Sequence, residues 1–182
     1  MKRAVFIDRD GVIIKEMNHM YRKEDLEIIP GSVEALKILN DKNYLVVLIT
    51  NQSVVARELC SLEELISMNN LIEQIFLKQN AIINKTYFCP HHPIEGKNPK
   101  YTKECECRKP KIGMIMKAKK ELGIYLPESY IIGDKTSDIK MGNDAGCKTI
   151  LVKTGYGGED NLFPEYKPDT IAENLLEAAS LI

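Results

Sequence analysis

Three features that the sequence lacks narrow the possible classes of protein. No apolar stretch approaches the ~20 residues of a membrane-spanning helix. The 25 basic and 26 acidic residues almost cancel, to a formal net charge of -1, so there is no basic excess of the kind that nucleic-acid-binding proteins show. The apolar run 4–7 is broken by Asp8, well short of the roughly 7–15 residues of a signal-peptide core. We therefore expect a cytoplasmic protein with neither nucleic acid nor a membrane as partner.

The cysteines are odd in number, since there are 5. A complete disulfide framework is therefore not expected, and cysteines of a cytosolic chain are more often metal ligands, catalytic groups or buried thiols. No internal repeat or low-complexity segment is present. The 182 residues suit one domain, 1–182, and 44% hydrophobic residues suffice for a sizeable core. With no surplus apolar face evident, we expect a monomer.

Short β-rich runs alternate with helical segments along the chain. We expect strands at 3–7, 44–50, 82–88, 130–132 and 149–152, helices at 32–42, 62–79, 112–122, 138–145 and 174–182, and a loop at 155–167. Ser61 and Glu64 fit a capping box at the start of the second helix. Strands separated by helices predict βαβ units and an α/β fold with a parallel sheet, whose ligands bind beyond the carboxyl ends of the strands. Residues 89–110 fit no element, and so long a loop needs a reason to be ordered.

An acidic pair, Asp8 and Asp10, follows the first strand. Two carboxylates so close repel each other unless a cation or a proton intervenes, and Mg²⁺ prefers such hard oxygen ligands. We interpret the pair as a phosphoryl-transfer site. Asp8 attacks the phosphorus of a phosphate ester, while Asp10 protonates the leaving oxygen and then deprotonates water. Gly11 permits the turn that brings both side chains together. The alternative for an isolated pair of this kind is a helix cap or a solvated turn.

Further polar clusters follow the other strands. Residues 50–53 end the second strand in hydrogen-bond donors that suit phosphate oxygens. Arg108 and Lys109 supply positive charge for the transferred phosphoryl group. Asp134 offers a metal ligand after the fourth strand, and Asp138 a carboxylate that orients it. Each cluster alone also fits a helix cap or a solvated charge, but their shared position at strand ends favours one site.

Two cysteine motifs bracket the irregular segment. Cys89 and His91, and likewise Cys105 and Cys107, are two residues apart, so each pair can face one ion in extended backbone. Three thiolates and one imidazole suit a closed tetrahedral zinc site that would order the loop. The alternative is free thiols with a surface histidine, and His92 could replace His91. The two remaining cysteines, Cys60 and Cys147, are expected to be packing residues.

The chain resembles the haloacid dehalogenase (HAD) superfamily in segments 6–11, 50–51 and 133–134 and at Lys109 and Asp138. Motifs at 50–53, 89–93, 105–110 and 133–135 are similar to its D-glycero-D-manno-heptose-1,7-bisphosphate 7-phosphatase branch, with histidinol-phosphatase as a near relative. The resemblance implies a Rossmann-like three-layer sandwich with no large cap domain and a zinc-pinned loop. It also implies bound Mg²⁺ and Zn²⁺.

The resemblance implies an aspartyl-phosphate on Asp8. The favoured reaction is conversion of the heptose bisphosphate to the 1-phosphate, within the carbohydrate metabolism of lipopolysaccharide biosynthesis. Mg²⁺ would be held by Asp8, Asp10 through its backbone carbonyl, and Asp134. Thr50 and Lys109 would steady the phosphoryl group. The expected substrate-binding residues are Glu16, Asn18, His19, Asn51, Gln52, Ser53, Arg57, Arg108 and Lys135.

The number of basic residues near strand ends favours a bisphosphate over histidinol phosphate, whose far end is cationic. This inference is open, because Arg57 can equally face solvent, as can Glu16, Asn18 and His19. The chain departs from the branch at 54–58, where Val54 and Glu58 replace glycines, and at Asn18 and His19, which replace a Gly-Tyr pair. The alternatives are a histidinol-phosphate or other phosphomonoester phosphatase, and a non-enzymatic phospho-acceptor signalling domain that has no need of Asp10.

Overall fold

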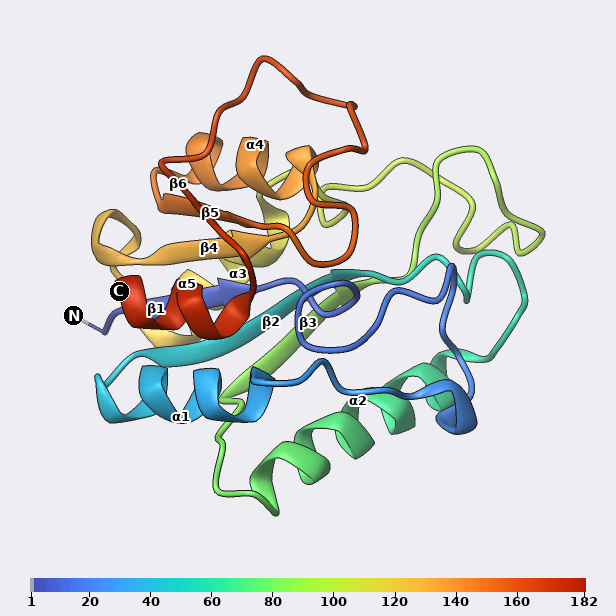
Figure 1. Cartoon of the computed structure of the whole chain (residues 1–182). Helices are drawn as coiled ribbons and strands as arrows, with labels where there is room; N and C mark the ends of the chain where they lie inside the picture. Colours follow the sequence, from blue (N-terminus) through green and yellow to red (C-terminus); the bar gives the residue numbers. More distant parts are fainter. Residues whose placement is uncertain (1) are drawn as a thin grey trace.

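The computed structural model describes residues 2–182. One sheet contains all the named strands of this range, and every pairing in it is parallel. The strands are β1 (Ala4–Ile7), β2 (Leu45–Asn51), β3 (Lys85–Cys89), β4 (Tyr130–Gly133), β5 (Lys148–Val152) and β6 (Thr170–Ala172). Their order, β3-β2-β1-β4-β5-β6, is that of a doubly wound sheet, so the expected Rossmann-like α/β architecture is confirmed (Figure 1).

Helices cover both faces of the sheet. They are α1 (Ser32–Asp41), α2 (Leu62–Leu77), α3 (Gly113–Leu122), α4 (Thr136–Ala145) and α5 (Leu175–Leu181), with short 3₁₀ turns at Lys23–Asp25 and Leu126–Glu128. Alternate residues of β1 point to opposite faces. Val5 and Ile7 pack in a cluster with α1, α2 and α5, whereas Phe6 packs with residues of α3 and α4. The result is a three-layer sandwich (Figure 1).

Local chemistry explains where the helices begin. Ser61 accepts a hydrogen bond from the Glu64 amide, and the Glu64 carboxylate accepts one from the Ser61 amide, which is the predicted capping box. Helix α4 begins two residues before the predicted start, because the Asp138 carboxylate accepts a hydrogen bond from the Lys135 amide and so lies inside the first turn.

The largest remaining differences from the sequence-based expectation concern two strands, β3 and β6. Strand β3 begins at Lys85 rather than at residue 82, since Ala81 and its neighbours are needed to turn the chain out of α2. The edge strand β6 was not expected at all. It has three residues, too few to show an alternating pattern, and it pairs only with β5. No helix within residues 2–182 is long and apolar enough to cross a membrane.

The long connections gather beyond the carboxyl ends of the strands, on the right of Figure 1. The segment 155–167 is a loop, as predicted, and it is pinned to the start of α4. Asp160 accepts hydrogen bonds from the Thr136 amide (2.7 Å) and hydroxyl (2.8 Å). The Lys140 ammonium donates to the Tyr166 hydroxyl at 2.9 Å. This loop therefore has a defined position beside the strand ends.

Candidate active site

A cavity of about 330 Å³ lies at the carboxyl ends of the strands. It brings together nearly all of the side chains that the sequence motifs predict to be catalytic or substrate-binding. They come from four separate segments of the chain. The predicted residues in its lining are Asp8, Asp10, Glu16, Asn18, His19, Thr50, Asn51, Gln52, Ser53, Arg108, Lys109 and Lys135. Arg57 is not in the lining. Asp134 and Asp138 are buried behind it.

Lys109 links two of the carboxylates. Its Nζ lies 2.8 Å from Asp8 Oδ1 and 2.7 Å from Asp138 Oδ1, and it donates to the Ile49 carbonyl at 3.3 Å. Burial alone would lower the pKa of this lysine, but the charges of Asp138 and Asp8 outweigh it and hold the pKa above its usual value. Lys109 is therefore a fixed positive charge against Asp8.

Asn51 aligns that lysine. Its side-chain amide donates to the Lys109 carbonyl at 3.2 Å, and its Oδ1 accepts from the Lys109 amide at 3.0 Å. The amide group of Asn51 is thus engaged with the backbone of the 105–110 segment. Although Asn51 borders the cavity, its visible function in the fold is to join the end of β2 to Lys109.

Three buried carboxylates, Asp8, Asp134 and Asp138, bring oxygen atoms within 4.8 Å of one another. Burial, followed by the charges of Asp8 and Asp138, raises the pKa of Asp134 to about 8. Asp134 Oδ1 is buried and has no hydrogen-bond partner among the described residues. So concentrated a set of oxygens, one without a partner, suits a hard divalent cation such as Mg²⁺.

Two glycines make room for this cluster. A Cβ atom on Gly11 would lie 2.3 Å from Asp134 Oδ2, and one on Gly155 would lie 2.1 Å from the same oxygen. Both glycines also have a positive φ, at 83° and 61°. The close approach of the two loops to Asp134 therefore requires residues without side chains.

Asp10 has a different environment from Asp8. Its carboxylate accepts hydrogen bonds from the Arg9 guanidinium at 3.1 and 3.0 Å and from Gln52 Nε2 at 2.6 Å. Burial by itself raises the pKa of Asp10. The charge and hydrogen bonds of Arg9, together with the hydrogen bond of Gln52, lower it by more, so the net pKa lies below the usual range. The two carboxylates of the acidic pair are thus distinguished by their partners, Lys109 for one and Arg9 for the other.

The loop after β1 meets the other side of the cavity. Glu16 Oε2 lies 3.1 Å from the Lys135 ammonium, and the Tyr156 hydroxyl donates to Asn18 Oδ1 at 3.4 Å. Lys135 also lies over the Tyr156 ring, 4.4 Å from its centroid. Burial would lower the pKa of Lys135, but the carboxylates around it, Asp8 first, raise it. Glu16, Asn18 and Lys135 therefore contact each other as well as the cavity.

His19 borders the cavity in a left-handed backbone conformation, with φ of 80°. Partial burial and the nearby charge of Arg57 lower the pKa of His19, which favours its neutral form. Asn18 and Glu58 are also left-handed, with φ of 46° and 58°. Asn18 and Glu58 stand where the resembling branch has glycine, so these departures place side chains on turns that favour glycine.

Arg57 lies outside the cavity. Its guanidinium forms an ion pair with Glu95, and its Nε donates to the Ser53 hydroxyl at 3.4 Å. Only about a quarter of its side chain is exposed, at 26%. It therefore ties the 91–104 loop to the end of β2, and reaches the cavity only through Ser53.

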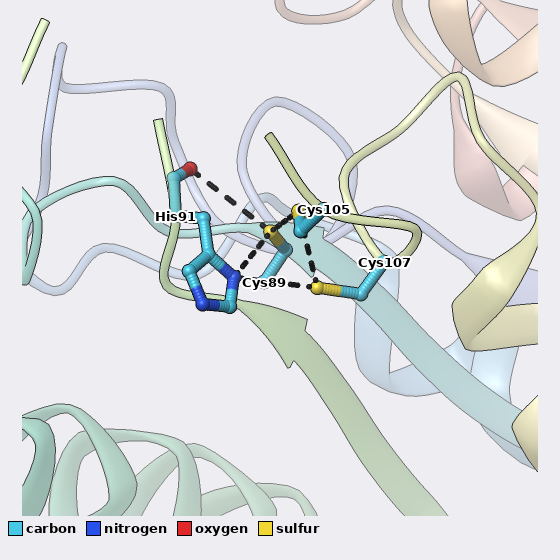
Figure 2. Close-up of side chains that lie close together, drawn as sticks. All are labelled: Cys89, His91, Cys105 and Cys107. Carbon is cyan, nitrogen blue, oxygen red and sulfur yellow. Dashed lines mark hydrogen bonds between the residues drawn. The ribbon is translucent and has the colours of Figure 1, made fainter. Parts of the chain in front are cut away.

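The cysteine motifs converge on one point (Figure 2). Cys89 Sγ lies 3.6 Å from His91 Nδ1 and 3.5 Å from Cys105 Sγ, and Cys107 Sγ lies 3.5 Å from both. A tetrahedral zinc ion with Zn–S of about 2.3 Å and Zn–N of about 2.0 Å has its ligand atoms about 3.5–3.8 Å apart. The four side chains fit such an ion, and they are held by the end of β3 and the 105–107 turn.

The thiols also have the electrostatics of a cation site. A hydrogen bond from Cys89 lowers the pKa of Cys107 to about 5, whereas the same contact and burial raise the pKa of Cys89. Without a metal, the protein thus favours the thiolate of Cys107 but disfavours a second thiolate at Cys89. A bound dication would stabilise both thiolates. His92 does not join the cluster: its Nδ1 accepts from the Ile94 and Glu95 amides at 3.3 and 2.7 Å.

This cluster is joined to the cavity by Arg108. The Arg108 guanidinium donates to the His91 carbonyl at 2.9 Å, and Arg108 itself borders the cavity. Burial lowers the pKa of Arg108. A metal that fixes Cys107 and His91 would therefore also fix Arg108. The other two cysteines, Cys60 and Cys147, are free thiols outside the cluster, as expected.

Sequence reasoning missed one wall of the cavity. Tyr156, Leu162 and Phe163, all from the pinned 155–167 loop, contribute apolar side chains to it. The signal that could have revealed this wall is the sequence of residues 155–158, an aromatic residue among glycines directly after a strand. The buried Arg9 was also missed, because a charged residue between two aspartates is usually read as solvated.

Comparison with known proteins gives this geometry a context. The HAD-hydrolase-like family model matches residues 106–178. A D-glycero-beta-D-manno-heptose-1,7-bisphosphate 7-phosphatase of Pasteurella multocida is 40% identical over 156 residues, which cover 85% of this chain and 84% of the relative. A D-glycero-alpha-D-manno-heptose-1,7-bisphosphate 7-phosphatase of Photorhabdus laumondii is 37% identical over 155 residues, which cover 85% and 84%.

A solved structure shares the whole fold. The D,D-heptose 1,7-bisphosphate phosphatase from B. bronchiseptica, crystallised with magnesium and phosphate, superposes with a TM-score of 0.84 at 28% identity, and covers 100% of this chain and 97% of that one. The expected resemblance is therefore confirmed by sequence and by fold. The chain belongs to the HAD-like hydrolases, in the group of the heptose-bisphosphate phosphatases.

Proposed function

We propose that this protein is a magnesium-dependent phosphatase that removes the 7-phosphate of D-glycero-D-manno-heptose 1,7-bisphosphate through an aspartyl-phosphate on Asp8. One observation carries the proposal. Two neighbouring carboxylates in one cavity have different cationic partners: Asp8 faces the Lys109 ammonium at 2.8 Å, and Asp10 is paired with Arg9. A reaction that needs one nucleophile and one acid–base group would use such a pair.

The chemistry proceeds in two steps. A carboxylate oxygen of Asp8 forms a bond to phosphorus as the bond to the sugar oxygen breaks. Asp10, which must enter this step protonated although Arg9 favours its ionised form, gives its proton to that oxygen. Water then attacks the aspartyl-phosphate and transfers a proton to Asp10, which releases inorganic phosphate and restores both side chains. Lys109 and the Thr50 hydroxyl, which both line the cavity, would stabilise charge on the phosphoryl oxygens.

Mg²⁺ would be held by Asp8, by the backbone carbonyl of Asp10 and by Asp134, and would neutralise the charge that gathers on the phosphoryl group. Asp138 would orient this arrangement through Lys109. Zn²⁺ would be held by Cys89, His91, Cys105 and Cys107, with a structural function. Its contribution to the reaction would be indirect, through the backbone that carries Arg108.

The rest of the substrate would lie against the cavity walls. Arg108 and Lys135 are the cationic side chains of the lining besides Lys109, and they suit the second phosphate of a bisphosphate. Asn18, His19 and Ser53 offer polar groups for sugar hydroxyls. Arg57 is assigned a supporting position rather than direct contact, because its guanidinium is already paired with Glu95.

A purified-protein assay tests the proposal. Phosphate release would be measured from both anomers of the heptose bisphosphate, from histidinol phosphate and from other sugar phosphates, with Mg²⁺ and with EDTA. We expect turnover only with Mg²⁺ and the highest kcat/KM with one heptose bisphosphate anomer. A preference for histidinol phosphate would replace the substrate but keep the class.

The non-enzymatic alternative makes a different prediction in the same assay. A phospho-acceptor signalling domain would accept one phosphoryl group and release it slowly, without multiple turnover. The presence of Asp10 in the cavity, two residues after Asp8, favours the enzyme, because a phospho-acceptor domain does not protonate a leaving group. We also propose one domain over residues 1–182, a monomeric state and a cytoplasmic location, which size-exclusion chromatography and cell fractionation would test.

A further inference from the structure

Arg9 is the largest fully buried side chain of the described residues, with no exposed surface. A guanidinium loses much hydration free energy on burial, and a buried ion pair is often no more stable than apolar residues of the same volume. A contribution to the stability of the fold is thus a weak explanation for the buried position of Arg9. The contacts of Arg9 point instead to Asp10.

All three nitrogens of the guanidinium have partners. Nε donates to Asp10 Oδ2 at 3.1 Å and Nη2 donates to Asp10 Oδ1 at 3.0 Å, which is a two-pronged contact that fixes the plane of the carboxylate. Nη1 donates to Asn69 Oδ1 at 2.8 Å. Asn69 lies on α2, is only 4% exposed, and is 60 positions away in the sequence. The guanidinium is therefore held from behind by a helix that contributes nothing else to the cavity.

The two oxygens of Asp10 are left unequal. Oδ2 also accepts from Gln52 Nε2 at 2.6 Å and from the Thr50 hydroxyl at 3.3 Å, in addition to Arg9. A carboxylate oxygen has about two lone-pair positions, so three donors saturate Oδ2. Oδ1 accepts from Arg9 alone among the described residues. Oδ1 is the oxygen with a lone pair left for the reaction.

We propose that Arg9 and Asn69 form a clamp that positions Asp10, so that Oδ1 alone exchanges the proton with the leaving group and with water. The inference rests on the proposed function, because it concerns the acid–base step of that reaction. Asp10 Oδ1–H gives its proton to the sugar oxygen as the P–O bond breaks. Oδ1 then takes a proton from the water that attacks phosphorus, and the cycle closes with no other reactant.

Asn69 offers a matched test, because Asn70 is its neighbour on the same helix and is exposed. Asn69→Ala removes the acceptor behind Arg9, whereas Asn70→Ala removes the same atoms from the surface. Asn69→Asp restores an acceptor for Arg9 Nη1. Arg9→Lys keeps the charge but loses the two-pronged contact, and serves as a second probe if Asn69→Ala folds poorly.

The readout is the dependence on the leaving group. Expulsion of a sugar alkoxide needs the proton of Asp10, whereas expulsion of p-nitrophenolate does not. Because general acid–base catalysis contributes about 10²–10⁴-fold in total, we expect Asn69→Ala to lower kcat/KM about 10-fold for the sugar phosphate and less than about 3-fold for p-nitrophenyl phosphate. Asn69→Asp should recover most of the loss, and Asn70→Ala should match the wild type on both substrates.

A double-mutant comparison separates positioning from general damage. In an Asp10→Asn background, Asn69→Ala should cause no further loss with the sugar phosphate. Equal losses on both substrates, or an undiminished loss in the Asp10→Asn background, would overturn the clamp while leaving the phosphatase intact. A wild-type protein that is inert towards every phosphomonoester would instead overturn the proposed function, and the clamp with it.

Discussion

The affinity for Mg²⁺ should depend steeply on pH, because Asp134, one of the proposed carboxylate ligands, has a raised pKa and is largely protonated at neutral pH. Burial and the charges of Asp8 and Asp138 raise the pKa of Asp134 to about 8 in the metal-free protein. Below this pKa the Asp134 side chain carries a proton that Mg²⁺ must displace. The affinity for Mg²⁺ therefore rises with pH and levels off above about pH 8.

With a pKa of about 8, the Asp134 carboxyl is roughly 1% ionised at pH 6, 10% at pH 7 and 50% at pH 8. The affinity for Mg²⁺ should therefore rise about 50-fold from pH 6 to pH 8, which is about 2.3 kcal/mol. Nearly one proton should be released per Mg²⁺ bound at pH 6, and about half a proton at pH 8.

Isothermal titration calorimetry of zinc-loaded protein measures both quantities. Titrations at each pH in two buffers of different ionisation enthalpy give the affinity and the number of protons released. An Asp134→Asn variant is the control, and it should bind Mg²⁺ weakly at every pH. Equal affinity at pH 6 and pH 8, with no proton released, would refute the assignment of Asp134 as a protonated ligand.

Three further predictions concern other parts of the molecule. Asp10→Asn should lower kcat for the sugar phosphate by about 10²–10⁴-fold in steady-state assays, and full activity would exclude the acid–base assignment. Elemental analysis should find one zinc per chain in the wild type and in Cys60→Ser but none in Cys105→Ser, and zinc in all three would place the ion elsewhere. Glu58→Gly should raise the unfolding free energy by about 1 kcal/mol in urea titrations, because a left-handed residue with a Cβ atom costs about that much, whereas Glu63→Gly in α2 should lower it; a decrease for Glu58→Gly would contradict this reasoning.

The position of the site followed from the sequence because it depends on topology more than on side-chain packing. In a parallel sheet every strand delivers its carboxyl end to the same edge, so motifs after three strands had to converge. The convergence of Cys89, His91, Cys105 and Cys107 was predictable for a similar reason, since spacing by two residues sets side-chain direction in an extended chain. Asp8, Lys109 and Asp134 lie where this reasoning put them.

What the sequence did not reveal are contacts between distant segments with no motif of their own. The contact of Arg9 with Asn69 joins a turn to the middle of a helix, and neither residue stands out locally. The same holds for Gln52, expected to bind substrate but hydrogen-bonded to Asp10, and for Phe163, which reaches the cavity because Thr136 anchors its amide. Such contacts depend on packing, which periodicity does not encode.

The central claim is that Asp8 carries the phosphoryl group during turnover. Rapid acid quench of the enzyme during hydrolysis of the sugar phosphate, followed by proteolysis and mass spectrometry, tests it most directly. We predict one phosphoryl group on Asp8, formed at the rate of turnover and absent from Asp8→Asn. Multiple turnover with no phosphorylated Asp8, or with the group on another side chain, would contradict the claim.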